Sequence, residues 1–370
     1  MFNLCFLKYL PYYTMTKKII ILGAGLTGLS IAYLLKKKGI DTHIIEARNR
    51  VGGRIETIKG NQDSPMEMGA TWFGKKHQNL FTFLEELEIG IFQQYMRGTT
   101  FFETMSFTPP QKFEVPASEE PSFRIQDGTS AVILKLTNEV GMENISLNQP
   151  ISKIEKKENT ISISTTEENN FEADLVISTI PAKLFVQSIE CSPALPKDAI
   201  SIFENTQIWM EGSVKFAVEY ASPFWKEKGL SGAVFSQSSL IPEMYDHTNY
   251  EENKFALKGF LNGSIVQYSK ADREEMVIQN LKKFFGADAT NHVGYFDRIW
   301  GNEKFTFSPT TNFLPSHYNN GHPIYQNSFW DNSFFMAGTE TVPNFGGYME
   351  GAIQSAILTA EKIYNNTITK

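Results

Sequence analysis

Three glycines near the start of the chain have the spacing of a phosphate-binding turn. Gly23, Gly25 and Gly28 directly follow residues 19–22, an apolar run typical of a buried strand. Glycines at these positions let the backbone turn tightly, approach a pyrophosphate and pack a helix on its strand. The amides at the start of the helix expected from about Leu26 would face the phosphates. The pattern therefore indicates dinucleotide binding.

An acidic residue and a second glycine turn follow this unit. The helix is expected to stop where Gly39 can adopt a left-handed conformation. The next strand, residues 41–45, ends at Glu46, whose carboxylate could accept hydrogen bonds from ribose hydroxyls. The sequence VGGR then places a glycine turn before Arg54, whose guanidinium suits a pyrophosphate. A lone glycine motif is weak evidence, but these features agree.

Two later segments could approach a flat ligand. Residues 67–73, EMGATWF, place small residues between bulky ones. In residues 334–363 a strand ends at AGTE and a helix begins after GGY, with Met349 and Glu350 in its first turn. The amides of that turn would stabilise negative charge on a ligand. A strand, loop and helix at this place are equally compatible with ordinary domain closure.

Residues 214–220 alternate in the manner of a strand, with Val214 and Phe216 on one face and Lys215 and Glu219 on the other. A lysine on a strand is ordinarily solvated. Taken alone, the pattern therefore favours an exposed Lys215 without a function.

Composition indicates a globular protein with two domains. The 370 residues are 41% hydrophobic and include 29 Phe, enough for large cores. Acidic residues outnumber basic ones, 41 to 34, and no basic cluster with interleaved aromatics is present, which argues against a nucleic-acid partner. The two cysteines, Cys5 and Cys191, suggest neither a disulfide framework nor a metal site and fit a reducing compartment.

Targeting signals are not evident in the sequence. Residues 1–16 are apolar but lack a charged start, a long uniform apolar run and a small-residue cleavage site, so we expect an N-terminal extension and no signal peptide. No stretch approaches the roughly 20 apolar residues of a membrane helix. We therefore expect a soluble, cytoplasmic protein without a membrane span.

Secondary structure is expected elsewhere with the usual periodicities. Helices are predicted at 77–88, 125–138 and 272–285, and strands at 151–154, 161–163, 174–180, 255–261 and 293–299. Residues 90–120 break the pattern and suit either a loop-rich pocket wall or an irregular packed layer. Strands after an interruption of this kind indicate a nucleotide-binding domain that is discontinuous in sequence.

The segments GAGLTGLS, EARNRVGGR, EMGATWF, ADLVISTIP, AGTE and GYMEGA together resemble the flavin-containing amine oxidase family, over nearly the whole chain. The resemblance implies an α/β fold in which a Rossmann-like FAD-binding domain of discontinuous segments carries a mixed-sheet, α+β substrate domain. The expected boundaries are 1–16 for the extension, 17–74, 127–197 and 303–370 for the FAD-binding domain, and 75–126 and 198–302 for the substrate domain.

The resemblance also implies site residues and FAD as the cofactor in place of NAD. Glu46 would contact the adenosine ribose, Arg48 and Arg54 the phosphates, and the Ile151 backbone the adenine. The full set of implied cofactor-binding residues is Gly23, Gly25, Thr27, Gly28, Glu46, Ala47, Arg48, Gly52, Gly53, Arg54, Gly69, Ala70, Thr71, Ile151, Trp300, Gly338, Glu340, Tyr348, Met349 and Ala352.

The chemistry that the resemblance implies is amine oxidation. A hydride passes from the carbon beside a neutral amine to flavin N5, the imine is hydrolysed to an aldehyde or ketone with release of ammonia, and molecular oxygen reoxidises the flavin to give hydrogen peroxide. Lys215, in the context SVKFAVEY, matches the family lysine that holds a water beside N5. Tyr348 would present an aromatic wall to the amine, and Trp72 and Trp300 would shape the pocket.

The sequence departs from the family pattern at the substrate end. Pro309 stands where mitochondrial amine oxidases carry the flavin-linking cysteine, so we expect non-covalent FAD. Thr310 replaces the second cage tyrosine, which leaves half a cage that Phe307 or Phe313 could fill. The insertion at 75–126 is short for the family, so we expect a trimmed helical part and a more open pocket.

Arginines that could clamp an amino-acid carboxylate have no distinguishing context in the sequence. The candidates are Arg97, Arg124, Arg273 and Arg298. Two other functions fit the FAD fingerprint: a desaturase of carbon–carbon bonds in a porphyrin-like or terpenoid substrate, and a non-catalytic FAD-binding protein. The sequence leaves the amine, the electron acceptor and the oligomeric state open.

Overall fold

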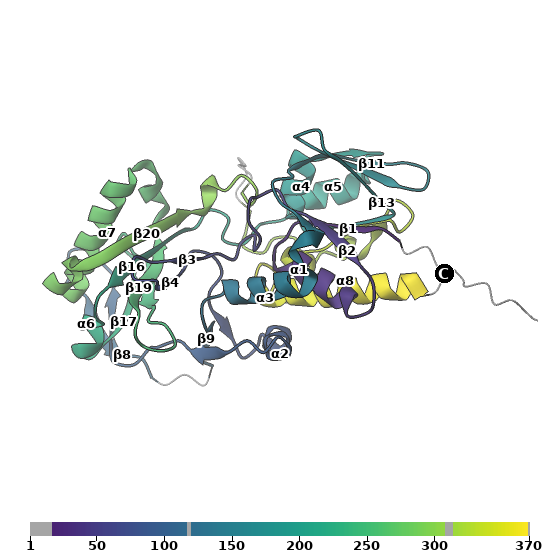
Figure 1. Ribbon diagram of the computed structural model, residues 1–370. Coiled ribbons are helices and arrows are strands. Elements are labelled where there is room, and N and C mark those ends of the chain that lie inside the picture. The colour runs from purple at the N-terminus through teal and green to yellow at the C-terminus, as the bar shows by residue number, and fades with distance from the viewer. Residues whose placement is uncertain (1–16, 117–119, 308–313, 369–370) are drawn as a thin grey trace, which may run out of the picture.

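The computed structural model describes residues 17–116, 120–307 and 314–368. Two parts lie side by side, each built on its own sheet (Figure 1). This architecture is the expected α/β fold with a mixed-sheet second part. The predicted fold class is therefore confirmed. The expected domain boundaries stay a prediction.

The first part is built on a six-stranded sheet with the order β10-β2-β1-β14-β22-β21, parallel except for β21. Its strands are β1 (Ile19–Leu22), β2 (Thr42–Ile45), β10 (Ile145–Ser146), β14 (Leu175–Ser178), β21 (Ser328–Phe329) and β22 (Phe334–Met336). Every residue of β1 and β14 is buried, because both faces of the sheet are covered. This explains why both strands read as continuous apolar runs.

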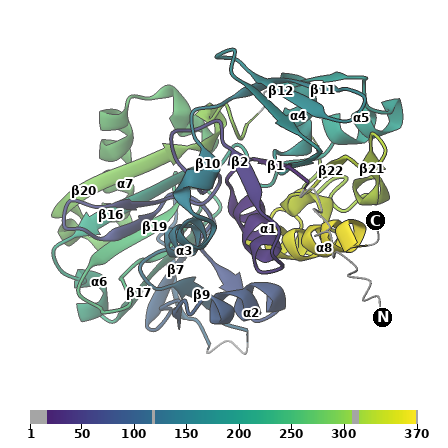
Figure 2. The same cartoon turned by 45° about the vertical axis from the view of Figure 1, so that its right-hand side comes forward.

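Helices cover one face of this sheet and a smaller sheet covers the other (Figure 2). The helices are α1 (Leu26–Lys36), α3 (Ser130–Val140) and α8 (Met349–Ile368). The opposite face carries α4 (Ala182–Ser188), α5 (Lys197–Glu204) and the sheet β13-β12-β11-β15. Those strands are β11 (Ile151–Lys156), β12 (Ile161–Thr165), β13 (Asn170–Ala173) and β15 (Glu190–Ser192). The strands expected at 151–154 and 161–163 are confirmed as β11 and β12.

The second part is built on a seven-stranded sheet with the order β20-β16-β19-β18-β17-β7-β8. Its strands are β7 (Thr99–Glu103), β8 (Gln111–Glu114), β16 (Val214–Tyr220), β17 (Leu230–Ser236), β18 (Glu243–Asp246), β19 (Phe255–Leu261) and β20 (His292–Ile299). One face packs against α7 (Lys270–Phe285), with the short α6 (Phe224–Glu227) at its end. Val277, Leu281 and Phe284 point inward from α7, as expected.

The other face of this sheet is also covered, which corrects the expectation of a solvated strand face at Lys215. All seven residues of β16 are buried. A hairpin of β3 (Thr57–Lys59) and β4 (Pro65–Glu67) packs there. The buried Glu219 carboxylate accepts hydrogen bonds from the Asn61 amide at 2.7 Å and the Gln62 amide at 3.1 Å. Polar residues on this face therefore bind the hairpin instead of water.

Residues 90–120 are more regular than expected. β7 and β8 form an edge of the seven-stranded sheet, and β6 (Ile91–Gln93) pairs with β9 (Ser122–Ile125), which also pairs with β5 (Phe73–Gly74). The expectation of an irregular segment was wrong. β8 is exposed along its length, so it has no apolar alternation to reveal it.

The N-terminus of α2 (Gln78–Glu86) is capped by a side chain from the other end of the chain. Its own N-cap residue, His77, makes no side-chain cap hydrogen bond. The buried Glu350 of α8 accepts from the Asn79 side chain at 2.6 Å and from the Leu80 amide at 2.8 Å. A carboxylate at this position satisfies free amides and complements the helix dipole.

We expect Glu350→Gln to lower the free energy of unfolding by about 1–2 kcal/mol, because a neutral amide offers one acceptor where the carboxylate offers two. Urea denaturation followed by circular dichroism measures the change. Glu361→Gln, at an exposed position of the same helix, is the matched control. Equal stability of the two variants would contradict the capping role.

Within the described ranges, no helix has the combination of length and apolar composition that crossing a bilayer requires.

Candidate active site

The first glycine turn lies between β1 and α1, as the sequence indicated. Gly23 has a φ of 102°, which only glycine adopts readily. A Cβ on Gly28 would lie 2.0 Å from the Gly23 carbonyl oxygen, so a hydrogen is required there for the helix to pack on its strand. Gly25 is extended, and a Cβ on it would meet no protein atom within 4 Å. The open side of Gly25 faces a cavity.

Glu46 stands at the end of β2 and holds the glycine turn. Its carboxylate accepts from the Ala24 amide at 2.8 Å and from the Arg48 amide at 2.9 Å. The side chain is buried and lines the same cavity. A carboxylate fixed by two backbone amides keeps further lone pairs that can accept from hydroxyl groups.

The second glycine turn lies directly against the first. The Gly52 amide donates to the Ala24 carbonyl at 2.8 Å, and Gly25 and Gly52 form an isolated parallel bridge. The Arg50 guanidinium closes this turn from behind by donating to the carbonyls of Ile55 at 3.3 Å and Gly53 at 3.1 Å. The two turns therefore form one continuous backbone surface.

Arginines of this turn are held by carboxylates from distant segments. Arg54 forms a bidentate pair with Glu340, with N–O distances of 2.5 and 3.0 Å. Burial alone would lower the pKa of Arg54, but the Glu340 carboxylate raises it above its ordinary value. Arg48 donates to the Thr306 hydroxyl at 2.6 Å and contacts Glu303 at 3.5 Å.

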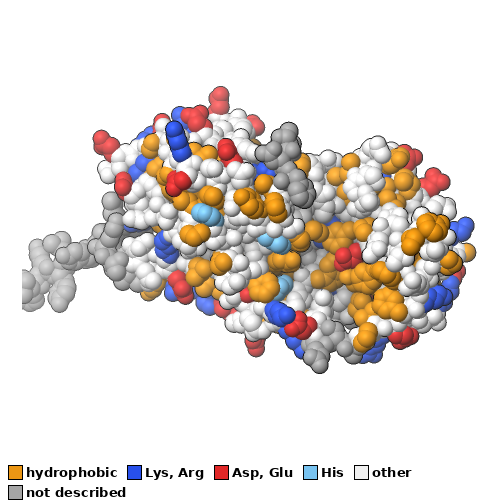
Figure 3. Space-filling view, turned by 180° about the vertical axis from the view of Figure 1, so that it is seen from behind, with side chains coloured by type: hydrophobic (Ala, Val, Ile, Leu, Met, Phe, Trp, Pro, Cys, Tyr) orange, Lys and Arg blue, Asp and Glu red, His pale blue; other side chains and the backbone are white. Residues whose placement is uncertain are grey.

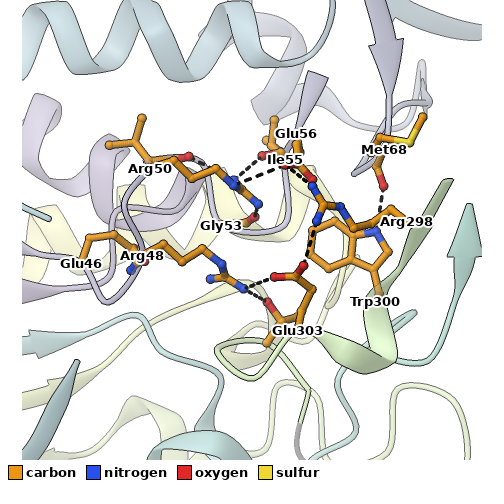
Figure 4. Close-up of polar contacts among 12 residues, drawn as sticks. Glu46, Arg48, Arg50, Gly53, Ile55, Glu56, Met68, Arg298, Trp300 and Glu303 are labelled. Carbon is orange, nitrogen blue, oxygen red and sulfur yellow. Dashed lines mark hydrogen bonds and ion pairs between the residues drawn. The ribbon is translucent and has the colours of Figure 1, made fainter. Parts of the chain in front are cut away.

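Figure 4 shows that Arg48 belongs to a chain of alternating charges that also contains Arg298 and Arg50. Arg298 lies between Glu303, at 3.0 Å, and Glu56, at 2.5 Å, and Glu56 in turn lies 3.5 Å from Arg50. The chain connects β20 of the second part to both sides of the glycine turns. It stabilises the orientation of Arg48, which lines the cavity described below.

These segments enclose a cavity of about 300 Å³, within the usual size range of ligand pockets. The expected cofactor residues that line it are Gly23, Gly25, Thr27, Glu46, Ala47, Arg48, Gly52, Gly53, Arg54, Ala70, Ile151, Gly338, Tyr348, Met349 and Ala352. Sequence reasoning missed several further lining residues, among them Gln149, Thr166, Thr179, Leu184, Lys304 and Phe305. Most of them lie in turns and loops, Leu184 lies on α4 and Thr179 follows β14. Thr179 belongs to the ADLVISTIP segment, but nothing in that segment marked its side chain as a lining residue.

Five expected cofactor residues do not line the cavity and lie behind it. Gly28 packs α1 on β1, and Glu340 pairs with Arg54. Trp300 is buried and donates to the Met68 carbonyl at 2.7 Å. Gly69 and Thr71 flank the lining residue Ala70, and the Thr71 hydroxyl donates to the Gly69 carbonyl at 3.1 Å.

The arrangement fits a dinucleotide with a large second ring system. Two glycine turns and the first turn of α1 offer backbone amides and close approach, which suit a pyrophosphate. The lining continues past Ala70 to Tyr348 and Met349 at the start of α8. Among the described residues, no group of three or more His, Cys, Asp or Glu side chains could hold a metal ion.

Lys215 of β16 lies behind the cavity wall and does not itself line the cavity. Its Nζ donates to the Gly69 carbonyl, next to the lining residue Ala70. Burial lowers the pKa of Lys215 to about 8, although Glu67 and Glu243 counteract this effect. The Nζ lies 5.0 Å from the ring centroid of Phe260 and 5.9 Å from that of Trp72.

Aromatic side chains of the second part surround Trp72. The Trp72 ring lies 5.1 Å from that of Tyr245 and 6.2 Å from that of Phe260, and its indole N–H donates to Gln94 at 2.8 Å. Hydrophobic side chains gather around a recess between the two parts of the molecule (Figure 3). Sequence reasoning did not single out Tyr245 or Phe260, which lie on separate strands.

Tyr348 lies in a second group of rings. His317 is stacked 4.2 Å from Trp209, and both rings lie within 6 Å of Tyr348, at 5.7 and 5.8 Å. His77 and Phe345 lie 5.8 and 6.4 Å from Tyr348 on other sides. The sequence pointed to Tyr348 only, because Trp209 and His317 come from loops that no motif marks.

Four residues of segment 307–313 were expected at the substrate end of the site. Pro309, Thr310 and Phe313 lie outside the described residues, and Phe307 is half-buried.

Three candidate arginine clamps already have partners. Arg124 donates to the Thr248 carbonyl at 2.8 Å, Arg273 pairs with Asp297 at 2.6 Å, and Arg298 belongs to the charge chain. Arg97 is exposed. Because of these contacts, the guanidinium groups of Arg124, Arg273 and Arg298 do not present a free pair of N–H donors to a substrate carboxylate.

Comparison with known protein families decides the identity of this arrangement. The family model of flavin-containing amine oxidoreductases matches residues 26–108 and 88–364. The chain belongs to this family. The family resemblance expected from the motifs is thereby confirmed, and the protein is an FAD-dependent oxidoreductase.

Named relatives extend over almost the whole chain. A probable flavin-containing monoamine oxidase A of Dictyostelium discoideum is 23% identical, with 93% of this chain and 97% of that protein covered. The flavin-containing amine oxidase B of Homo sapiens is 20% identical, with 93% and 85% covered.

Solved structures of the family show the same fold. Putrescine oxidase bound to putrescine superposes with a TM-score of 0.82 at 20% identity, covering 94% of this chain and 99% of that chain. Cyclohexylamine oxidase from Brevibacterium oxydans has a TM-score of 0.82 at 18% identity, with 95% and 99% covered. The fold of this flavoprotein is therefore that of the FAD-dependent amine oxidases.

Proposed function

We propose that the protein oxidises an amine to an imine, which water hydrolyses to an aldehyde or ketone and ammonia, while molecular oxygen is reduced to hydrogen peroxide. FAD supplies the acceptor for the hydride that leaves the carbon beside the amine nitrogen. The observation that carries this proposal is the position of Lys215. Its Nζ is buried and donates to Gly69, directly beside the cavity lining at Ala70.

Cofactor contacts are proposed for the residues that line the cavity. Both glycine turns and the α1 N-terminus would hold the pyrophosphate, with Arg48 and Arg54 beside it. Glu46 would accept from ribose hydroxyls. Because Arg54 is already neutralised by Glu340, it is oriented by that pair before the ligand arrives. The first turn of α8 would stabilise negative charge at the other end of the cofactor.

The substrate would meet two groups of aromatic side chains, one around Tyr348 at the start of α8 and one around Trp72. Tyr348 presents an aromatic face that can orient an amine, and Trp209 with His317 extends this aromatic surface. Aromatic rings around Trp72 exclude water and so favour the neutral amine from which a hydride leaves. Lys215, with a pKa near 8, would hold a water or assist oxygen reduction at neutral pH.

An anaerobic bleaching screen tests the proposal. Primary amines, polyamines and amino acids are mixed with the holoenzyme without oxygen, and the flavin absorbance is followed. We expect at least one amine to bleach the flavin and, in air, to produce peroxide. A flavin that dithionite reduces but that no amine in the panel bleaches would contradict amine oxidation. Bleaching by hydrophobic carbon–carbon donors alone would favour a desaturase.

The bound FAD is expected to be non-covalent, because Pro309 stands at the flavin-linking position of the mitochondrial relatives. After acid precipitation and centrifugation, the yellow colour should remain in the supernatant. Apoprotein prepared in this way should regain flavin absorbance when FAD is added. Flavin that stays with the precipitate would refute this expectation.

A further inference from the structure

Two lysines are buried side by side on neighbouring strands of the seven-stranded sheet. Lys215 of β16 and Lys258 of β19 are 6% and 0% exposed. The antiparallel register pairs Lys215 with Phe260 and Ala217 with Lys258. The two lysines are therefore diagonal neighbours on one face of the sheet.

Both side chains end at the same segment of the cavity wall. Lys215 Nζ donates to the Gly69 carbonyl, and Lys258 Nζ donates to the Thr71 hydroxyl, which itself donates to Gly69 at 3.1 Å. Lys258 Nζ lies 4.1 Å from the Trp72 ring centroid, and Lys215 Nζ lies 5.9 Å from it. A continuous chain of hydrogen bonds thus links the two amines.

The surroundings do not neutralise two positive charges. Within the described part of the chain, neither lysine forms an ion pair with a carboxylate. The Glu67 charge acts to raise the pKa of both lysines. One of its carboxylate oxygens already accepts from the Thr129 amide at 2.6 Å and the Thr57 hydroxyl at 3.0 Å. The Glu243 carboxylate likewise acts to raise the pKa of both lysines.

Further groups that face Lys258 add positive charge or none. Arg124 lies on the adjoining side and disfavours a second cation. His247 Nε2 accepts from the Glu67 amide and faces an Arg124 N–H, each at 3.4 Å, so its proton belongs on Nδ1 and the ring is neutral. Burial and the Arg124 charge lower the pKa of His247 well below its ordinary value, in agreement with a neutral ring.

The order in which the two lysines bind protons follows from their positions. Burial lowers the pKa of Lys215 to about 8. Burial and the neighbouring Lys215 charge lower the pKa of Lys258 well below its ordinary value. Lys258 carries the additional penalty of the Lys215 charge, so we expect Lys215 to bind the first proton of the pair. Interaction between two such groups is reciprocal.

We propose that Lys215 and Lys258 form one proton-binding unit against Trp72, in which Lys258 is a positioning residue that holds Thr71 and Gly69 and controls the charge on Lys215. The inference rests on the proposed function only for its effect on catalysis. A neutral Lys258 does not repel the charged form of Lys215, whereas a charge at Lys258 would lower the pKa of Lys215. Loss of Lys215 would allow Lys258 to take up the proton.

Lysine-selective ¹³Cε labelling and NMR titration of the FAD-bound protein measure both ionisations directly. Signals are assigned from Lys215→Met and Lys258→Met. In Lys215→Met, the Lys258 midpoint should move to higher pH by about one unit or more. In Lys258→Arg, the permanent charge should move the Lys215 midpoint below its value of about 8 by a similar amount. Lys254→Met, just before β19, is the matched control and should move neither midpoint.

Unmoved midpoints in both variants would overturn the proposal, since two independent lysines give that result. If Lys258→Arg does not fold, the Lys215→Met titration decides alone. The measurement needs no organic substrate, so it stays informative if no amine bleaches the flavin. A failed bleaching screen with shifted midpoints would reject amine oxidation and retain the two-lysine unit.

Discussion

Gly28→Ala is expected to destabilise the protein even without FAD, by about 3 kcal/mol, whereas Gly25→Ala is expected to weaken FAD binding with little change in the stability of the apoprotein. A Cβ at Gly28 would lie 2.0 Å from the Gly23 carbonyl and 3.1 Å from the Thr179 hydroxyl. The Gly23 carbonyl belongs to the β1–α1 turn, and Thr179 directly follows the end of β14. Relief of the clash requires α1 to move away from the sheet.

Gly25 differs because its open side faces the cavity and not the protein. An added methyl group meets no protein atom within 4 Å, and the φ of −77° suits alanine. The methyl group would occupy space next to the bound pyrophosphate. FAD affinity should therefore fall roughly tenfold or more, a loss of ~1.4 kcal/mol.

Urea unfolding of the apoproteins and fluorescence titration with FAD separate the two effects. Gly263→Ala is the control for alanine substitution itself. Gly263 does not line the cavity, and a Cβ on it would meet no protein atom within 4 Å. A Gly28→Ala apoprotein as stable as wild type would show that the helix tolerates the displacement. Unchanged FAD affinity in Gly25→Ala would place the pyrophosphate elsewhere.

Lys215→Met is expected to leave FAD bound and to slow reoxidation of the reduced flavin by oxygen about a hundredfold. Methionine has a similar length and can fill the buried site, but it cannot carry charge or donate to Gly69. The reaction is measured by stopped flow after reduction with dithionite, so no amine is required. Lys254→Met, at a half-buried position outside the cavity lining, is the control.

The pH dependence of reoxidation follows from the lowered pKa of Lys215. Lysine is charged below its pKa, so the charge is present below about pH 8 and is lost as pH rises through that value. A rate that depends on this charge should fall over the same range. The step near pH 8 should be absent in Lys215→Met. A rate and pH profile equal to those of wild type would show that Lys215 is structural.

Local patterns predicted the nucleotide-binding half well because its motifs act at short range. The spacing of Gly23, Gly25 and Gly28 specifies a turn in which Gly28 packs on the Gly23 carbonyl, five residues earlier in the chain. The strand end at Glu46 follows from the same βαβ unit. Such features depend on backbone geometry and the order of neighbouring elements, both of which a sequence displays directly.

Long-range packing explains what the patterns missed. β16 reads as a half-exposed strand, yet both faces are covered because the β3–β4 hairpin, over 140 residues earlier, packs on the second face. Glu350 lies in the GYMEGA segment, but its side chain caps α2 and does not line the cavity. Partners at such separations leave no trace in local periodicity.

By itself the sequence determined the dinucleotide turn, its acidic strand end and, through the joint motifs, the family with FAD as cofactor. Only the tertiary structure decided that Lys215 is buried beside Gly69, that Lys258 reaches the same segment, and that Trp209 and His317 surround Tyr348. The physical reason is that turns are specified by the conformations of adjacent residues, whereas burial and charge at a site depend on which distant strands and loops the fold brings together.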